Sequence, residues 1–315
     1  DLTGSRPVDH STPPEYDVVI AGDVYCDLIF TGLDTLPRLG EEHFARAFEM
    51  TPGGVFITAA ALARLGLSVG LCSWLGDDPF SEFALRCFAQ EGLSTALVQR
   101  RPGPLPTLTV SLSLPGDRSF VTYRAPRPSP DPAAVLRRTT FRHLHISSLP
   151  GLFEHPDLVE LAHERGASIS IDCQWCPDLI AAPDLADRLV AARPAVFLPN
   201  LDEALAITHT TAATEALESL AAWVPTVITL GPAGVLAGCD GERYAVPALP
   251  VTAVDTTGAG DAFDAGFIYG LLHGLPFGEC LRVGTVCGGL STTAHGGATA
   301  APRRPVVEAW LARGW

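Results

Sequence analysis

The sequence predicts an α/β protein with a mostly parallel, doubly wound sheet. Apolar runs of strand length alternate with helix-length amphipathic segments along most of the 315 residues. This alternation is typical of parallel strands covered by helices on both faces. Two β-rich segments interrupt it and indicate a small second sheet. No linker divides the chain, so we expect one domain over residues 16–315, preceded by a polar, proline-rich mobile tail over residues 1–15.

The expected elements follow one another in order along the chain. Strands are predicted, from short apolar runs, at 16–22 and 67–76 and near 143–147, 167–171, 195–198 and 225–230. Helices are predicted, from apolar residues three and four apart, at 54–66 and 78–92 and near 154–165, 178–192 and 201–207. The helix over 54–66 is expected to end at Gly66, because glycine favours the left-handed backbone found there.

The second sheet is predicted from residues 41–50 and 105–125. The latter segment consists of two β-rich runs joined at PGD, which is a hairpin signal. We expect the two segments to pair and to form a lid, contributed by about 31–52 and 105–125, over one edge of the main domain. Exposed strands of a lid often need a partner edge, so homodimerisation through the lid is a hypothesis.

Composition excludes several functions. Acidic residues outnumber basic ones 35 to 21, for a net charge of −14, which argues against binding nucleic acid or anionic membranes. No apolar stretch is long enough to span a bilayer and no secretion signal is recognised, so a cytoplasmic protein is expected. All 21 basic residues are arginine. Without lysine, neither a Walker-type phosphate loop nor a pyridoxal Schiff base can form.

Cysteine and histidine do not indicate a metal site. The eight cysteines are expected to be reduced, small apolar residues. Cys173 and Cys176 form a C-x-x-C pair, but no second pair has zinc-ligand spacing. His143 and His145 are spaced to share one face of a strand, and we interpret them as packing residues.

The stretch VDTTGAGDAFDAG (254–266) carries the clearest chemical signal. Gly258, Ala259 and Gly260 directly precede Asp261, and the apolar run of a helix follows. Backbone N–H groups at the start of a helix favour an anion, and small residues let a phosphate approach them. A carboxylate there could take the proton of an attacking hydroxyl. The residues alone leave a second reading open, a tight turn in which Asp261 favours the helix dipole. Asp264, one helical turn on, is taken as a supporting or solvated residue.

A resemblance to a known family supports the first reading. DTTGAGDAF (255–263) resembles the signature of the ribokinase-like, PfkB-type carbohydrate kinases. Four other segments resemble the family in the same order: GGVFITAAALARLG (53–66), GDDPFSEFALRCFAQEGLST (76–95), PNLDEA (199–204) and TLGPAGVLA (229–237). Five motifs in register are specific. The resemblance implies a ribokinase-like fold and transfer of the γ-phosphoryl group of Mg-ATP to a hydroxyl of a monosaccharide or related polyol.

The resemblance also implies roles for individual residues around the phosphates. Asp261 would be the general base, and the N–H groups of Gly258, Ala259 and Gly260 the anion hole. Further positions match nucleotide and cation contacts: Asn200, Thr229 and Gly231 for the nucleotide, Asn200 and Glu203 for Mg²⁺ held through water, and Asp255 and Thr257 for the monovalent cation that several members bind. Whether this chain uses K⁺ stays open.

On the substrate side, the resemblance implies five contacts: Asp27, Gly53, Gly54, Thr58 and Arg124. The acceptor-only carboxylate of Asp27 suits the hydroxyls of a polyol. Thr58 stands where the family usually has an Asn that touches substrate, which leaves the sugar's identity open. The segment IDCQWCPD (171–178) lacks an Arg that many members have there, and this argues against acidic sugars that would use it. Arg124 could supply that charge instead.

Three alternatives remain at this stage. A nucleoside kinase of the same fold would need aromatic walls for a base, and candidates in the lid segments are Phe44, Phe48, Phe120 and Tyr123. A phosphosugar kinase would need several arginines near the sugar, of which Arg124 and Arg127 are available. A non-catalytic sugar or nucleotide sensor would be free to lose the base, so the presence of Asp261 favours an enzyme.

Overall fold

An eight-stranded sheet forms the centre of the protein. The structure is a computed structural model, and it describes residues 14–114, 117–126 and 131–315. Within these residues the strand order is β14-β13-β12-β11-β10-β9-β1-β4. Strand β13 is antiparallel to β12 and β14, and the other neighbours run parallel. The strands are β1 (Tyr16–Ala21), β4 (Val69–Cys72), β9 (Phe141–Ile146), β10 (Ser168–Asp172), β11 (Val196–Leu198), β12 (Thr226–Thr229), β13 (Val235–Cys239) and β14 (Glu242–Val246).

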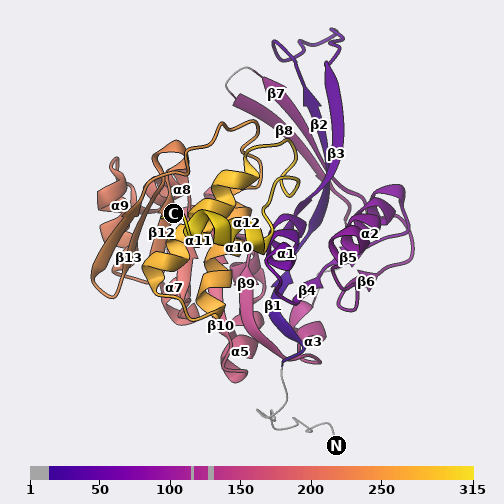
Figure 1. Cartoon of the computed structure of the whole chain (residues 1–315). Helices are drawn as coiled ribbons and strands as arrows, with labels where there is room; N and C mark the ends of the chain where they lie inside the picture. Colours follow the sequence, from indigo (N-terminus) through magenta and orange to yellow (C-terminus); the bar gives the residue numbers. More distant parts are fainter. Residues whose placement is uncertain (1–13, 115–116, 127–130) are drawn as a thin grey trace, which may run out of the picture.

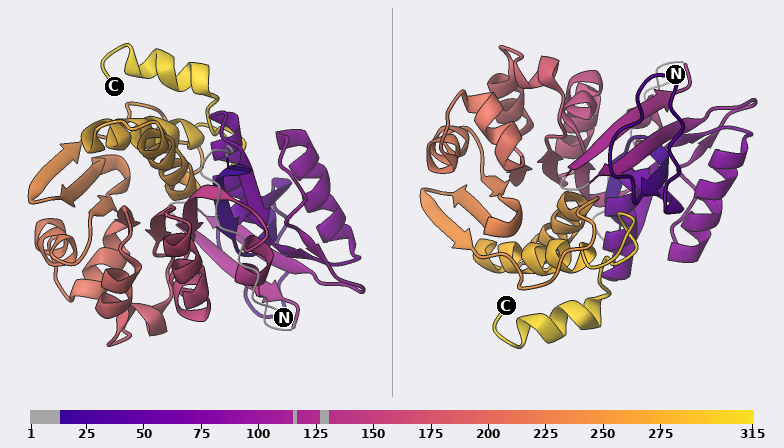
Figure 2. Two further views of the ribbon diagram at one scale, coloured as in Figure 1. Left: turned by 90° about the horizontal axis from the view of Figure 1, so that it is seen from below. Right: turned by 90° about the horizontal axis from the view of Figure 1, so that it is seen from above.

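Helices cover both faces of this sheet (Figure 2). One face packs against α3 (Pro132–Leu136), α4 (Leu149–Glu154), α5 (Pro156–Glu164), α6 (Pro177–Ile180), α7 (Leu185–Ala192), α8 (Leu201–Thr208) and α9 (Ala213–Ala221). The other face packs against α1 (Val55–Arg64), α2 (Pro79–Glu91), α10 (Ala259–Leu272) and α11 (Phe277–Ser291), with α12 (Arg304–Leu311) on the outside of α11. The predicted α/β class with a mostly parallel, doubly wound sheet is confirmed.

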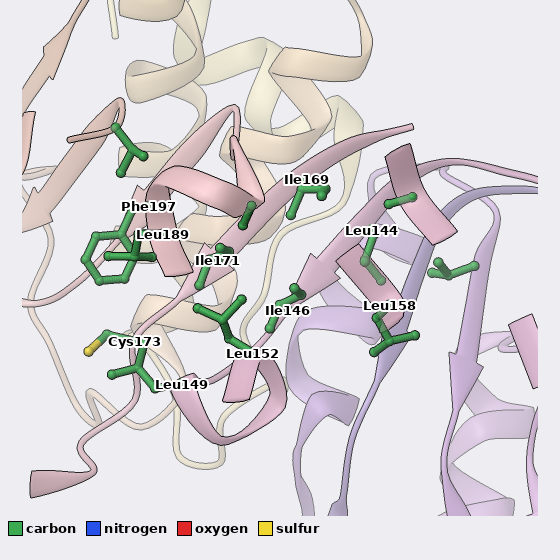
Figure 3. Packing of buried hydrophobic residues seen from close by; sticks show 14 of the residues in the cluster. Leu144, Ile146, Leu149, Leu152, Leu158, Ile169, Ile171, Cys173, Leu189 and Phe197 are labelled. Atoms are coloured by element: carbon green, nitrogen blue, oxygen red, sulfur yellow. The ribbon is translucent and has the colours of Figure 1, made fainter. Parts of the chain in front are cut away.

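The core explains why the strands are continuously apolar. Val18, Val19 and Ile20 of β1 are fully buried, because both faces of the strand lie under helices. Figure 3 shows the packing on one face, where Leu144 and Ile146 of β9 lie with the side chains of β10 and of α4 and α5. Burying a side chain of this size stabilises the fold by about 1.5–3 kcal/mol.

A second, four-stranded sheet projects from one edge of the main domain (Figure 1). In the described part of the chain its order is β3-β2-β7-β8, with strands β2 (Val24–Thr31), β3 (Ala47–Gly54), β7 (Thr107–Leu114) and β8 (Asp117–Arg124). Strands β2 and β7 are parallel, and the outer two are antiparallel to their neighbours. We refer to these four strands as the small sheet. A further pair, β5 (Trp74–Leu75) and β6 (Gln99–Arg100), stands apart from both sheets.

The register divides the small sheet into two chemically different faces. Asp27, Thr109 and Thr122 are paired across β2, β7 and β8, so their side chains share one face. A 3.2 Å contact between the Thr109 and Thr122 hydroxyls agrees with this. The same alternation puts Phe48 and Val121 on the opposite face, which is mainly apolar. We call the face that carries Asp27 the inner face and the other the outer face.

Several expected elements differ from the structure. Residues 41–50 and 105–125 do not pair directly, because β2 lies between β3 and β7. The predicted strand over 67–76 ends at Cys72, and the chain then leaves the main sheet as β5. The single helix expected near 178–192 is divided into α6 and α7. A strand such as β2 is hard to recognise because apolar residues occur at both odd and even positions of VYCDLIFT, without regular alternation.

Some of the predictions concern residues outside the described ranges. The predicted tail, residues 1–15, lies almost wholly outside the described residues, as do Arg127 and the first two residues of the PGD turn. None of the helices in the described ranges has the length and apolar character needed to cross a membrane.

Candidate functional site

The candidate site is built around the first turn of α10. Gly258 precedes the helix with φ of 70°, and no side chain caps the helix N-terminus. A Cβ on Gly258 would lie 2.9 Å from both the Gly297 Cα and the Ile57 Cγ2, so this position accepts only glycine. A Cβ on Gly260 would meet nothing within 4 Å, and the space beside it is open. The Ala259 N–H makes a long, 3.3 Å contact with the Thr256 carbonyl. An uncapped N-terminus next to open space is suited to bind an anion.

The carboxylate of Asp261 lies in this first turn and contacts a buried hydroxyl. The Thr58 Oγ1 donates a 2.7 Å hydrogen bond to the Asp261 Oδ1. Thr58 belongs to α1 and is fully buried, so its hydroxyl is held in place by the packing of α1 against α10. Burial raises the pKa of Asp261 to about 6, although the Thr58 hydrogen bond acts in the opposite direction. A carboxylate with a pKa near working pH is suited to general-base chemistry.

A second carboxylate, Asp27, faces Asp261 from the inner face of the small sheet. Burial raises the pKa of Asp27 to about 7; the Thr109 hydroxyl opposes this rise and the charge of Asp261 adds to it. Gly53 lies on the neighbouring strand, and a Cβ there would stand 2.0 Å from the Asp27 Oδ2. The Asp27 carboxylate therefore requires glycine beside it. Gly54 ends β3 and caps α1. Asp27 lies within strand β2 rather than at a strand end.

The residues predicted for the nucleotide gather at the carboxyl ends of β11 and β12. Asn200 and Thr229 form a β-bridge there. Gly231 follows two residues after Thr229, and a Cβ on it would meet nothing within 4 Å. The Asn200 Oδ1 accepts from the Glu203 N–H at 3.0 Å, and the Asn200 N–H donates to the Glu203 Oε2 at 2.8 Å. These reciprocal bonds form a capping box at the start of α8. Glu203 is thus both the N3 residue of the capping box and a buried acid of the site.

An acidic cluster lies beneath these groups. Burial raises the pKa of Asp172 and of Asp264 well above the usual range, and the neighbouring charges of Glu203 and Asp261 raise both further. Burial also raises the pKa of Glu203. Asp264 is only 3% exposed, so the expectation that it is solvated is wrong. In the described ranges, no set of three or more His, Cys, Asp and Glu side chains has the geometry of a metal site.

His143 and His145 are buried side chains of β9, as predicted for packing residues on a strand, and His145 lies next to Asp264. The His145 Nε2 is 3.9 Å from the Asp264 Oδ2, and its Nδ1 is 2.8 Å from the Ser170 hydroxyl. The His143 Nε2 is 2.7 Å from the same hydroxyl. Burial lowers the pKa of His145 to about 4, so the ring is neutral at physiological pH and does not compensate the charge of Asp264.

Arg118 is a site residue that sequence reasoning missed. It lies on the inner face of β8, and its Nη1 donates to the Asp255 Oδ1 at 2.9 Å and to the Thr257 hydroxyl. Its Nη2 donates to the Thr256 hydroxyl at 3.1 Å. Asp255 and Thr257 are the positions for which the resemblance implies a monovalent cation. The available sequence signal for this residue was its position directly after the PGD turn. Nothing local in the sequence predicts that its partner, Asp255, lies 137 residues away.

The remaining lid arginine, Arg124, lies further along the inner face. Its Nη1 donates to the Asp23 Oδ2 at 3.1 Å, and Asp23 is largely buried. The structure therefore brings Thr58 into contact with Asp261 and places Asp27 near enough for the charge of Asp261 to raise its pKa. The residues predicted for the nucleotide lie at the ends of β11 and β12. Arg124 is held by an acid of the β1–β2 turn.

Comparisons with known proteins identify the family and the fold. The model of the pfkB family carbohydrate kinases matches residues 16–304. A fructokinase from Klebsiella pneumoniae is 34% identical over 282 residues, which are 82% of this chain and 91% of that protein. A putative ribokinase II from E. coli, solved with ATP and Mg²⁺, superposes with a TM-score of 0.77 at 20% identity, covering 95% of this chain and 99% of that one. A nucleoside kinase from Burkholderia thailandensis, solved with inosine, has the same score, identity and coverage.

The acidic cluster generates a prediction about stability. The raised pKa of Asp264 means that the folded state holds its proton more tightly than the unfolded state, where the pKa is near 3.9. Its ionisation therefore costs stability, and this cost is absent below pH 4 and grows as the pH rises. Asp264→Asn is expected to raise the free energy of unfolding at pH 7.5, because the amide cannot ionise and avoids this cost.

Chemical denaturation of both proteins at several pH values measures this gain. The advantage of the variant should shrink towards pH 4.5. Glu308→Gln changes an acid of α12 that is 60% exposed, and it serves as a matched control with little effect. A variant less stable than the parent at pH 7.5 would contradict the interpretation.

Proposed function

Because the chain belongs to the pfkB family of carbohydrate kinases, and is thus a phosphotransferase with an alcohol acceptor, we propose that it transfers the γ-phosphoryl group of Mg-ATP to a hydroxyl of a free monosaccharide or related polyol. One observation carries the proposal: the Asp261 carboxylate lies in the uncapped first turn of α10, hydrogen-bonded by Thr58 and facing Asp27. Because ATP is the proposed co-substrate, we place the reaction in the cytoplasm.

The proposed step uses each group of that turn. Asp261 takes the proton of the substrate hydroxyl as its oxygen forms a bond to the γ-phosphorus and the bond to the leaving ADP oxygen breaks. Negative charge on the transferring group then faces the backbone N–H groups at Gly258, Ala259 and Gly260. A raised pKa suits Asp261 to this role, because a carboxyl group with a pKa of about 6 is mostly ionised at pH 7 and still accepts a proton readily.

The polarity of the inner face supports a neutral, hydroxyl-rich substrate. Asp27 accepts hydrogen bonds from hydroxyls and would repel a second anion. Of the two described arginines that point from β8 toward the site, Arg118 pairs with Asp255 and Arg124 with Asp23. These pairs leave little positive charge for the phosphate of a phosphosugar. The free sugar is therefore the preferred substrate class.

A nucleoside is the second candidate, and one residue favours it. Phe120 pairs with Ser111, which pairs with Ile29, so its ring lies on the inner face, where it is 56% exposed. A base could stack on it. Phe48 and Tyr123 lie on the outer face and cannot serve as such walls. One aromatic wall supports a nucleoside less strongly than the carboxylate pair supports a polyol.

The nucleotide and Mg²⁺ belong to the other half of the site. We propose that Asn200, Thr229 and Gly231 contact the nucleotide, at the carboxyl ends of parallel strands where ligands bind in α/β proteins. Glu203 is held by its cap and is close enough to Asp172 to raise the pKa of that group. Such a concentration of carboxylate charge fits a hydrated Mg²⁺ bound through water. The ion would neutralise the phosphates and orient them.

The first test is ADP release from Mg-ATP across free sugars, sugar acids, phosphosugars and nucleosides. Turnover is expected on a free sugar. Asp261→Asn should lower kcat by about 10²–10⁴-fold, the usual contribution of a general base, while ATP still binds in a calorimetric titration. Activity confined to nucleosides would support the second candidate. An Asp261→Asn variant that keeps most of its rate would show that the base is assigned wrongly.

The hydrogen bond from Thr58 predicts a shift in the pH profile. Asp261 acts unprotonated, so kcat/KM should fall as the pH drops through about 6 to 7, the range in which Asp261 and Asp27 titrate. Thr58→Val keeps the shape of the side chain but removes the donor that lowers the pKa of Asp261, and the acid limb should move to higher pH. Thr58→Ser retains the hydroxyl and should leave the limb near its original position. Superimposable limbs for the Val and Ser variants would exclude this coupling.

We also propose that the protein forms a homodimer through the small sheet. Its outer face exposes Phe48, Val121 and Tyr123 by 57%, 69% and 54%. Met50, on β3 with Phe48, is 37% exposed, whereas Val121 and Tyr123 lie on β8 at the other edge of the sheet. Exposed apolar side chains at both edges of one sheet face are typical of an interface. A second copy of the same face would cover it and would leave the inner face over the site.

Sedimentation at micromolar concentration tests the dimer. Val121→Glu puts a charge on the outer face and is expected to shift the protein to monomer, because burying two unpaired carboxylates opposes association. Val254→Glu, at a position that is also exposed (52%) but lies outside the small sheet, should leave the dimer intact. A parent protein that sediments as a monomer would rule the dimer out.

A further inference from the structure

Arg118 joins the small sheet to the loop that leads into α10. Its guanidinium donates to the Asp255 Oδ1 at 2.9 Å, to the Thr256 hydroxyl at 3.1 Å and to the Thr257 hydroxyl. The Arg118 side chain is 28% exposed and that of Asp255 is 10% exposed, so the pair is largely removed from water. The Cζ of Arg118 also lies 5.7 Å from the centre of the Phe120 ring. Gly258, the first residue of the anion hole, comes directly after Thr257.

The atoms of Asp255 are already committed in this arrangement. The Oδ1 accepts from the Thr257 N–H at 2.9 Å and from the Thr257 hydroxyl at 2.7 Å, in addition to Arg118. The Oδ2 accepts from the Gly296 N–H at 3.1 Å. Burial alone would raise the pKa of Asp255, but the hydrogen bonds from Thr257 and Gly296 and the charge of Arg118 lower it overall. The carboxylate is therefore ionised and compensated by a cation from within the chain.

These contacts do not fit the monovalent cation that the resemblance implies for Asp255 and Thr257. A K⁺ ion needs several oxygen ligands with free lone pairs, and a guanidinium next to them repels it. The Asp255 Oδ1 and the Thr257 hydroxyl both face the Arg118 guanidinium. The positive charge is present without an ion.

We propose that Arg118 is a positioning residue that takes the place of a monovalent cation, and that the enzyme works without K⁺. The inference rests on the proposed phosphoryl transfer. Without a positive partner, the Asp255 carboxylate would stand close to the anion hole and oppose the negative phosphoryl group. Arg118 cancels that charge and fixes the turn at Thr257, which sets the direction of the N–H groups that follow it.

Because Arg118 is supplied by the small sheet, its contact with the loop also depends on the position of that sheet. Arg118 belongs to β8 of the small sheet, and the same sheet carries Asp27. An ion from solvent would be bound independently of the sheet, whereas the arginine can occupy its place only when β8 lies against the loop. The anion hole is thus complete only with the small sheet in place, which couples substrate contacts on that sheet to phosphate binding.

The parent protein gives the first test. Thermal unfolding and kcat are measured in KCl, NaCl and choline chloride at one ionic strength. We expect kcat to agree within about twofold and the melting temperature to show no increase specific to K⁺. Activation by K⁺ of more than about threefold, or a K⁺-specific rise in melting temperature, would overturn the proposal.

Arg118→Ala gives the second test. It should lower kcat at least tenfold in NaCl and, with room opened beside Asp255, gain a K⁺-specific rise in melting temperature that the parent lacks. Arg46→Ala is the matched control, since Arg46 also forms a pair beside the small sheet, with Asp34 at 3.3 Å, but both side chains are mostly exposed. A variant with parental kcat, or one as insensitive to K⁺ as the parent, would contradict the role of Arg118.

A second variant and the unfolding measurement distinguish the remaining outcomes. If Arg118→Ala does not fold, Arg118→Lys retains a charge and should remain insensitive to K⁺, and K⁺ activation of that variant would count against the proposal. Unfolding needs no substrate, so it separates the two proposals. A protein inactive on every acceptor but unaffected by K⁺ refutes the proposed function alone, and a sugar kinase that requires K⁺ refutes the role of Arg118 alone.

Discussion

The site depends on a partly buried carboxylate at the open N-terminus of a helix. Asp261 is held there because α10 lies between α1 and α11, and its first turn carries no side-chain cap. The free N–H groups make the position favourable for negative charge, while burial makes a permanent charge costly. Burial outweighs the hydrogen bonds from Thr58 and the backbone, and the pKa of Asp261 rises to about 6. A carboxylate with this pKa can exchange a proton with a bound hydroxyl.

The alternation of side chains along its strands gives the small sheet one polar face and one apolar face. Its inner face presents Asp27 and Arg118 to the loop and helix of the main domain, and its outer face is apolar. A shift of register by one residue would exchange the two faces and move Asp27 away from Asp261. Gly53 restricts this register, because only a residue without Cβ fits beside the Asp27 carboxylate.

Local sequence patterns predicted the parts of the site that are local in the chain. The GAGD turn and the alternation of strands and helices depend on residues close together in the chain, so spacing and residue type suffice. Asn200 and Glu203 were identified only through the family resemblance, and their capping box was seen first in the structure. The pairing of β2 between β3 and β7, and the contact of Arg118 with Asp255, join segments far apart in the sequence. The sequence left open whether Asp264 is a supporting or a solvated residue, because α10 is apolar around most of its circumference and its hydrophobic period does not distinguish an exposed face.

The distribution of charge also explains why so acidic a protein can handle a polyphosphate. Asp255 is neutralised by Arg118, and Asp23 by Arg124, so two of the acids nearest the small sheet carry no net charge toward the site. Burial raises the pKa values of Asp172, Glu203 and Asp264, and the charge of Glu203 raises those of Asp172 and Asp264 further. On the proposed reaction, the arrival of Mg²⁺ with the nucleotide would relieve that repulsion. Relief of this repulsion would then contribute favourably to the free energy of binding the metal nucleotide.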